Sequence, residues 1–151
     1  MTRFFSIDAA NAAIPELRTI LETLRDERSQ LIALRDEFAR QTAREAAPTP
    51  GDPAPPEPLP AGTGDDPADG EGRRRLRLRM QGVIDQMQAG VARIDELGVT
   101  LREIETGLID FPALVSGRQV WLCWRLGEGE IESWHELGDG FGGRQALVDL
   151  S

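Results

Sequence analysis

Apolar residues recur every three or four positions in the first third of the chain, which is the period of an amphipathic helix. After Pro15, a residue suited to a first helical turn, no glycine or proline interrupts the chain as far as Glu45. Ser6 and Asp8 precede this stretch and are candidate N-caps. The pattern predicts a first helical arm over residues 6–46. Its apolar seam consists of Leu17, Leu21, Leu24, Leu31 and Phe38.

A second stretch with helical spacing keeps a heptad pattern typical of a coiled coil. Its seam consists of Met80, Val83, Met87, Gly90, Ile94 and Leu97. Gly98 suits the position just after a helix end, so the second helical arm is predicted over residues 73–97. Antiparallel pairing of the two arms is expected to place the long Arg28 side chain opposite Gly90, which leaves room for it.

From Val99 the apolar period changes to two, the period of a β-strand. The predicted strands cover residues 99–104, 108–115, 118–125 and 131–136. Pro112 confines the second strand to an edge or shortens it. The predicted fold class is α+β, in one domain (1–151). A long antiparallel helical hairpin is followed by a small three- to four-stranded antiparallel β-meander over residues 98–151.

The segment between the two helical arms, residues 47–72, differs in composition from its surroundings. It holds eight of the ten prolines, six acidic residues, no basic residue and one large apolar side chain, Leu59. Such a segment cannot bury enough apolar surface to offset the entropy lost on ordering. We expect a disordered acidic linker, rich in proline and glycine, inserted in the hairpin.

The composition excludes several kinds of chemistry. All 17 basic residues are arginine, so a mechanism that needs a lysine is excluded, and the formal net charge is −9. One cysteine and one histidine cannot form an internal disulfide or a Cys₄ or Cys₂His₂ zinc site. No apolar run reaches membrane-spanning length and the N-terminus lacks a signal-peptide pattern, so we expect a cytoplasmic protein without membrane insertion.

Five arginines crowd the start of the second helical arm. They are Arg73, Arg74, Arg75, Arg77 and Arg79. This cluster is a candidate anion-binding site for nucleic acid or an anionic membrane surface. Cations at a helix N-terminus oppose the helix dipole, however, and the acidic residues just before them neutralise the cluster locally. We therefore favour a solvent-exposed, salt-bridged face and expect no nucleic-acid partner.

Cys123 and His135 have the most distinctive chemistry in the chain. We expect the third and fourth strands to pair with Trp121 opposite His135, so that Cys123 and His135 share one face as diagonal neighbours. The pair is then a candidate for metal ligation or for a thiolate–imidazolium nucleophile. Carboxylates able to complete a metal site are Asp110, Glu128 and Glu136. The alternative is a buried cysteine and a hydrogen-bonded histidine without further role.

The glycine-rich loop over residues 138–143 matches neither a Walker loop nor a dinucleotide-binding fingerprint. The residue after it, Arg144, is expected to clamp the carboxylate of Glu128 or Asp139. The candidate functional face as a whole consists of Asp110, Cys123, Glu128, His135, Glu136 and Arg144.

Several short motifs gather in the C-terminal third. They are residues 107–112 (GLIDFP), 117–118 (GR), 122–124 (LCW), 127–128 (GE), 134–136 (WHE), 140–141 (GF) and 143–144 (GR). Together with residues 4–11 and the PEL sequence at 15–17, this string resembles a bacterial family of uncharacterised proteins, the domain of unknown function 2203. The resemblance implies a small prokaryotic protein of helices and sheet, and it carries over no catalytic residue.

Two functional hypotheses follow. The first is a non-enzymatic scaffold or interaction module that forms a homodimer through the helical hairpin or binds another protein, because two long helices cannot cover their own apolar stripe along its full length. The second is a metal-binding protein or metal-dependent hydrolase that uses the face of Cys123 and His135, with zinc as the candidate metal. No other cofactor is predicted.

Overall fold

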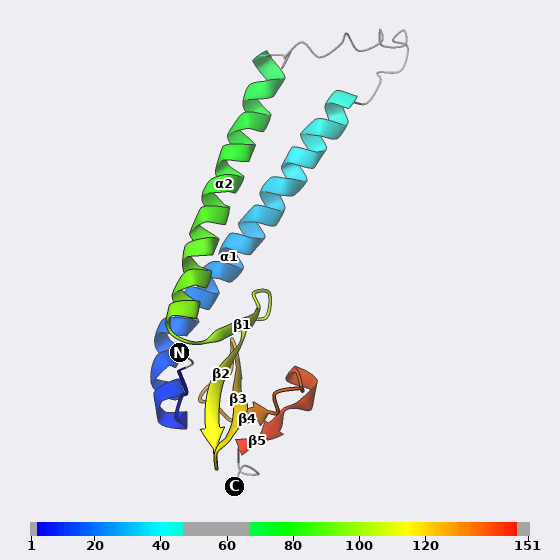
Figure 1. Ribbon diagram of the computed structural model, residues 1–151. Helices are drawn as coiled ribbons and strands as arrows, with labels where there is room; N and C mark the ends of the chain where they lie inside the picture. Colours follow the sequence, from blue (N-terminus) through cyan, green and yellow to red (C-terminus); the bar gives the residue numbers. More distant parts are fainter. Residues whose placement is uncertain (1–2, 47–66, 148–151) are drawn as a thin grey trace. The chain divides into compact units, whose positions relative to one another are not determined.

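A computed structural model describes residues 3–46 and 67–147 of the chain (Figure 1). Two helices are followed by an antiparallel sheet, so the predicted α+β fold is confirmed. The elements are α1 (Ile7–Ala46), α2 (Pro67–Glu96), β1 (Thr100–Glu103), β2 (Leu108–Val115), β3 (Arg118–Arg125), β4 (Ser133–His135) and β5 (Gln145–Ala146), with a 3-10 helix at Phe141–Gly143. The strands pair in chain order, and the two-residue β5 extends the predicted meander to five strands. Within the described ranges, no helix is both long and apolar enough to cross a membrane.

Close contacts divide the chain into two compact units. One comprises residues 1–28 and 86–151, and the other comprises residues 29–85. The first unit contains the sheet together with parts of both helices. The second contains the remaining parts of α1 and α2, where Arg77 lies over the ring of Phe38 at 5.4 Å.

The start of α1 is capped by a residue that the sequence marks as a candidate. The Ser6 Oγ accepts a hydrogen bond from the backbone N–H of Ala9 (3.0 Å), which satisfies a donor that has no partner within the helix. The helix then continues through Pro15 as one element rather than beginning anew there. Burial of Ala10 and Ile14 holds this first part of the helix in place although Pro15 supplies no backbone N–H.

The start of α2 differs from the prediction. The helix begins at Pro67, six residues before the predicted start at Arg73. Proline is favoured in the first turn of a helix, and an ion pair between Glu71 and Arg75 (3.8 Å) lies in this early part. The predicted disorder of the linker concerns mainly residues 47–66, which lie outside the described residues.

The end of α2 follows the predicted glycine cap. Gly98 has a φ of +81°, a conformation that costs glycine little. The Gly98 N–H donates to the Asp95 carbonyl (2.9 Å), and the Val99 N–H donates to the Ile94 carbonyl (3.2 Å). These two bonds form a Schellman motif, which turns the chain from the helix into β1.

One face of the sheet packs against the helices of its unit (Figure 1). Alternate residues of β2 and β3 form the sheet side of this core, namely Ile109, Phe111, Ala113, Val120, Leu122 and Trp124. The helix side includes Leu17, Leu21, Leu24 and Ile94, each at most 1% exposed. Burial of one such side chain contributes about 1.5–3 kcal/mol. The Asn11 Oδ1 also accepts a hydrogen bond from the Ile131 N–H (2.7 Å), which ties the segment before β4 to α1.

The register of the helix pair differs from the one predicted. Gly90 faces Leu24, because a Cβ on Gly90 would lie 3.1 Å from the Leu24 Cδ2. Arg28 lies one helical turn away and reaches Glu105, with 3.8 Å between Nη2 and Oε2. The prediction that Arg28 faces Gly90 is wrong. Leucine gains more from the close helix contact, since arginine keeps its charge near water.

Candidate metal centre

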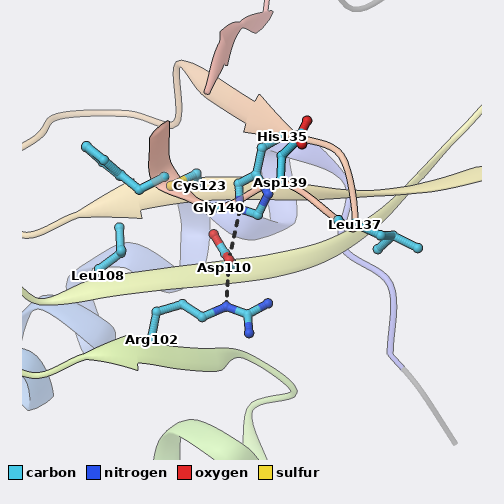
Figure 2. Close-up of a pocket in the computed structure, with 10 residues that line it drawn as sticks. Arg102, Leu108, Asp110, Cys123, His135, Leu137, Asp139 and Gly140 are labelled. Carbon is cyan, nitrogen blue, oxygen red and sulfur yellow. Dashed lines mark hydrogen bonds and ion pairs between the residues drawn. The ribbon is translucent and has the colours of Figure 1, made fainter. Parts of the chain in front are cut away.

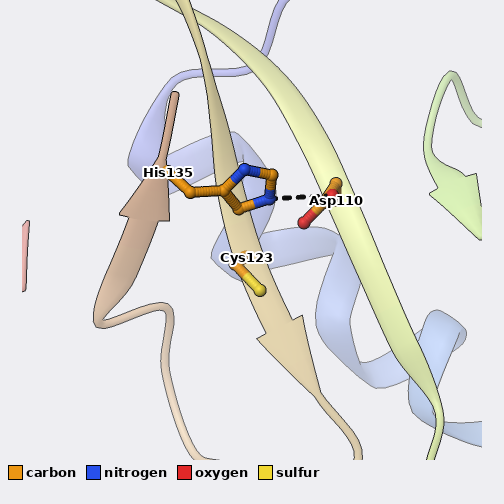
Figure 3. Close-up of side chains that lie close together, drawn as sticks. All are labelled: Asp110, Cys123 and His135. Atoms are coloured by element: carbon orange, nitrogen blue, oxygen red, sulfur yellow. Dashed lines mark hydrogen bonds and ion pairs between the residues drawn. The ribbon is translucent and has the colours of Figure 1, made fainter. Parts of the chain in front are cut away.

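Three neighbouring strands bring Asp110, Cys123 and His135 together on one face of the sheet. Asp110 on β2 lies opposite Cys123 on β3, and His135 on β4 lies opposite Trp121. The second pairing is the one predicted, so Cys123 and His135 are diagonal neighbours as expected. One potential ligand atom from each of the three residues lies within 4.8 Å of the other two (Figure 3).

This face is the one turned away from the helices, because successive side chains of a strand point to opposite sides. Asp110, Cys123 and His135 are nevertheless only 1–2% exposed. The segment after β4 covers them. A cavity of about 340 Å³ remains between this segment and the sheet, lined by the three residues, Arg102, Leu108 and residues 137–141 (Figure 2).

Both ring nitrogens of His135 face oxygen acceptors. Nδ1 lies 2.9 Å from the backbone carbonyl oxygen of Glu136, and Nε2 lies 2.9 Å from the Oδ2 of Asp110. A neutral imidazole carries one ring hydrogen and donates to only one of these two oxygens. With that hydrogen on Nδ1, the Nε2 lone pair faces the carboxylate, and a cation between the two atoms would take the place of the missing hydrogen.

Asp110 is the residue on which the polar contacts of the site converge. Its Oδ2 accepts a hydrogen bond from the Nε of Arg102 (2.8 Å), which approaches from the side opposite His135 (Figure 2). Its Oδ1 is buried and has no hydrogen-bond partner among the described residues. An unsatisfied buried acceptor costs about 1–3 kcal/mol, and more when it is charged. This oxygen is therefore suited to contact a cation.

The surroundings of Cys123 favour the neutral thiol. Burial and the nearby negative charge of Asp110 raise the pKa of this thiol to about 12, and the charge of Arg144 opposes the rise only in part. Both ring nitrogens of His135 have partners other than Cys123. The geometry thus gives no support to a thiolate–imidazolium nucleophile. A coordinating metal ion, in contrast, deprotonates a thiol outright.

The donor set matches the preferences of zinc. Zn²⁺ binds thiolate sulfur, imidazole nitrogen and carboxylate oxygen, whereas Ca²⁺ and Mg²⁺ prefer oxygen ligands alone. The contact from the His135 Nδ1 to the Glu136 carbonyl is the kind of outer hydrogen bond that orients a metal-bound histidine. The Arg102 Nε supports Asp110 in the same way.

A comparison with protein families bears on the motifs that contain these residues. The family model described as "Uncharacterized conserved protein (DUF2203)" matches residues 3–147, nearly the whole chain. The chain belongs to the DUF2203 family. The resemblance seen in the short sequence motifs is thereby confirmed. No curated protein and no solved structure matches the chain.

Two further residues of the predicted face of this DUF2203 protein, Glu128 and Arg144, form an ion pair with each other. The Arg144 Nη2 lies 2.8 Å from both carboxylate oxygens of Glu128, and the Glu128 Oε1 also accepts a hydrogen bond from the Arg125 N–H (2.7 Å). The expected clamp of Arg144 therefore forms with Glu128. Arg144 also lies over the ring of Phe141 at 4.5 Å, which helps to hold the segment that covers the site.

The remaining predicted carboxylate, Glu136, contributes its backbone rather than its side chain. Its carbonyl oxygen accepts from His135, while its carboxylate pairs with the Nη1 of Arg118 at 3.0 Å. Of the three carboxylates considered for metal ligation, the structure therefore brings Asp110 to the cysteine and histidine.

Arg102 is the residue of the site that sequence analysis missed. Thr100 on β1 pairs with Asp110, and the register of β1 with β2 shifts between Leu101 and Glu103. Arg102 lies at this irregularity, and its Nε reaches the Asp110 Oδ2 from there (2.8 Å). The alternation of β1 was visible in the sequence, but no motif marks Arg102, and its partner strand is known only from the sheet.

The arginine cluster over residues 73–79, which begins six residues after the start of α2, belongs to the other compact unit. Arg73, Arg74 and Arg77 line a cavity of about 280 Å³ with Gly70, and Arg75 pairs with Glu71. Anion binding by this cluster of the DUF2203 protein stays a prediction.

Proposed function

We propose that this DUF2203 protein binds one divalent metal ion, with zinc as the best match, through Asp110, Cys123 and His135. The observation that carries the proposal is the convergence of these three buried side chains, whose ligand atoms lie within 4.8 Å of one another. Each side chain comes from a different strand of one sheet. The backbone ladder therefore holds the donors in place before a metal ion binds, which reduces the entropy lost on binding.

A buried cysteine and histidine also occur as ordinary packing residues. Two features favour ligation over packing. Burial of a carboxylate is far more costly than burial of an apolar group of similar size, so a packing role gives no reason for Asp110 in this position. The Asp110 Oδ1 also lacks a partner among the described residues, although Arg102 and His135 both contact the other oxygen.

The number of protein ligands, three, also indicates which kind of zinc site this is. Structural zinc sites are closed by a fourth side chain, whereas catalytic sites keep the fourth position for water, whose pKa the metal lowers to about 7. The cavity of about 340 Å³ beside the ligands leaves room for water or a small ligand. The proposal therefore includes metal-dependent hydrolysis.

Elemental analysis of untagged protein, purified without chelator, tests the metal site. We expect close to one metal ion per chain. Substitution with cobalt(II) is expected to give the charge-transfer absorption of a thiolate–cobalt bond, which reports on Cys123 directly because the chain has no other cysteine. The variants Cys123→Ser and His135→Gln are expected to lose both the metal and the absorption band.

The matched control is Glu136→Gln, which neutralises the carboxylate next to His135 and keeps the backbone carbonyl. It is expected to bind metal like the wild type. Equal metal content in the wild type and in Cys123→Ser would contradict the proposal. So would a folded wild-type protein that takes up no zinc when zinc is supplied.

Self-association through the helices remains a second proposal with less support. The seam residues Leu17, Leu21 and Leu24 are buried within the chain, whereas Leu78 is 65% exposed on α2. Sedimentation over a wide concentration range tests this self-association. If Leu78 makes an apolar contact between two copies of the chain, Leu78→Gln is expected to associate more weakly than the wild type. A monomer at all concentrations contradicts it.

A further inference from the structure

We infer that Arg102 binds the oxyanion group of a small ligand, a carboxylate or a phosphate, beside the metal site. The inference deepens the proposed function and rests on it, because the same ligand is expected to reach the metal ion. It concerns the class of molecule that the cavity accepts, and it comes from how the guanidinium group of Arg102 is held.

Two contacts hold the Arg102 guanidinium. Its Nε donates to the Asp110 Oδ2 at 2.8 Å, and its Cζ lies 4.9 Å from the centre of the Trp121 ring. An arginine held by its Nε and stacked on an aromatic ring has lost much of its side-chain freedom before any ligand arrives. Binding a ligand therefore costs less entropy than it does for a free surface arginine.

The contacts leave the outer nitrogens of Arg102 for a ligand. No described residue accepts a hydrogen bond from its Nη1 or Nη2. The side chain is 41% exposed and lines the same cavity as Asp110, Cys123 and His135 (Figure 2). Outer guanidinium nitrogens match two oxygens of a carboxylate or phosphate, and such charge-assisted bonds are among the strongest in proteins.

The charges on the sheet side of the cavity agree with an anionic ligand once metal is bound. A divalent cation and Arg102 together outweigh Asp110 and a Cys123 thiolate. Asp139 on the covering segment also lines the cavity, and its charge brings the sum over the whole lining to zero. A ligand oxyanion between the metal and Arg102 thus meets a net positive environment on the sheet side of the cavity.

Arg118 provides a matched comparison within the same sheet. It also lies over a tryptophan, with its Cζ 5.8 Å from the centre of the Trp134 ring. Its Nη1, however, is already paired with Glu136 at 3.0 Å, and Arg118 does not line the cavity. Substitution of Arg118 removes the same charge from the protein without touching the proposed ligand site.

Titration calorimetry of the zinc-loaded full-length protein with acetate and with methylphosphonate tests the inference, at ionic strength held constant with sodium chloride. The ring signals of the single histidine, followed by NMR, report separately on metal binding. We expect one oxyanion site per chain that chloride does not block. Arg102→Gln is expected to weaken binding about tenfold or more, and Arg118→Gln less than twofold.

The variant Arg102→Lys covers the case in which Arg102→Gln does not fold, because lysine keeps the charge and loses the planar fork. An oxyanion affinity of Arg102→Lys below that of the wild type supports the inference. Equal oxyanion affinity in the wild type and in the folded Arg102 variants overturns it, as does absent oxyanion binding by wild-type protein whose His135 signals show bound zinc. If the His135 signals never respond to zinc, the proposed metal-binding function fails. The same titrations without zinc then test Arg102 alone. Oxyanion binding that is lost in the Arg102 variants supports the inference, and absent oxyanion binding by the wild type overturns it.

Discussion

The His135 ring is held at both nitrogens, with Nε2 2.9 Å from the Asp110 Oδ2 and Nδ1 2.9 Å from the Glu136 carbonyl oxygen. Asp110 and His135 lie 25 residues apart in the chain and are each 3% exposed in their side chains. Removal of one member of a buried pair leaves the polar atoms of the other without compensation. This relationship leads to the first two predictions.

Asp110→Asn is expected to destabilise the metal-free protein by about 3 kcal/mol, the lower end of the cost of breaking a buried pair. An amide oxygen carries no charge to balance Arg102, and it is a weaker acceptor than the carboxylate oxygen that Arg102 and His135 both contact. Urea unfolding in the presence of a chelator measures the effect. Asp85→Asn is the control, because Asp85 accepts an exposed hydrogen bond from Gln81 (2.9 Å), and its cost is expected to stay within about 0.5 kcal/mol. Equal costs for the two variants would show that the Asp110 contacts contribute little to the fold.

Zinc is expected to stabilise the wild-type protein and not the His135→Gln variant. A ligand that binds only the folded state adds about 2.7 kcal/mol at a free concentration a hundred times its Kd. The increase in Tm on adding zinc, and its reversal by chelator, measure this linkage. Glu136→Gln serves as control and is expected to gain as much as the wild type. A gain in His135→Gln equal to that of the wild type would place the metal elsewhere.

Cys123 is expected to make the stability of the metal-free protein fall in alkaline solution. Its thiol has a pKa of about 12 in the fold, mainly because of burial, against about 8.5 in an unfolded chain. Below about pH 8.5 both states hold the proton and the contribution to stability is complete. As the pH rises from there toward 12, only the unfolded thiol ionises, so the contribution is lost by up to about 1.4 kcal/mol per pH unit.

Urea unfolding between pH 8 and pH 11 measures this loss. The chain has no lysine and no tyrosine, so no other side chain with an ordinary pKa in that range obscures it. Cys123→Ala is the control, and its stability is expected to stay nearly level over the same range. A wild-type curve as flat as that of the variant would mean that the thiol ionises normally in the folded protein.

Gly107→Ala is expected to destabilise the sheet, whereas Gly82→Ala is expected to stabilise α2. Gly107 has a φ of +67°, and a Cβ there would lie 2.5 Å from the Cβ of Leu126. Gly82 lies in a helix, and a Cβ added there would come within 4 Å of no described atom outside its own stretch of helix backbone, so alanine is expected to gain about 0.5–1 kcal/mol. Urea unfolding of both variants checks the opposite signs, and a stabilising Gly107→Ala would contradict the strand contact at this turn.

The sequence by itself determined the local features of this protein. A period of three to four predicted both helices, and Ser6 and Gly98 mark the positions at which capping contacts form. A period of two predicted the strands and the faces of β3. The pairing that makes Cys123 and His135 diagonal neighbours could also be predicted, because a short loop between adjacent strands leaves few registers that keep apolar residues on one side.

Only the tertiary structure decided which residues surround that pair. Asp110 rather than Glu128 or Glu136 joins it because β2 lies on the other side of β3, and Arg102 enters the site only through the pairing of β1 with β2. The register of the two helices could not be predicted from the sequence for a similar reason. Leu24 and Gly90 are brought together by packing of the helices against the sheet as well as against each other. Local periodicity depends on backbone geometry within a few residues. Contacts between distant segments depend on how all helices and strands pack against one another at the same time. No short stretch of sequence contains that information.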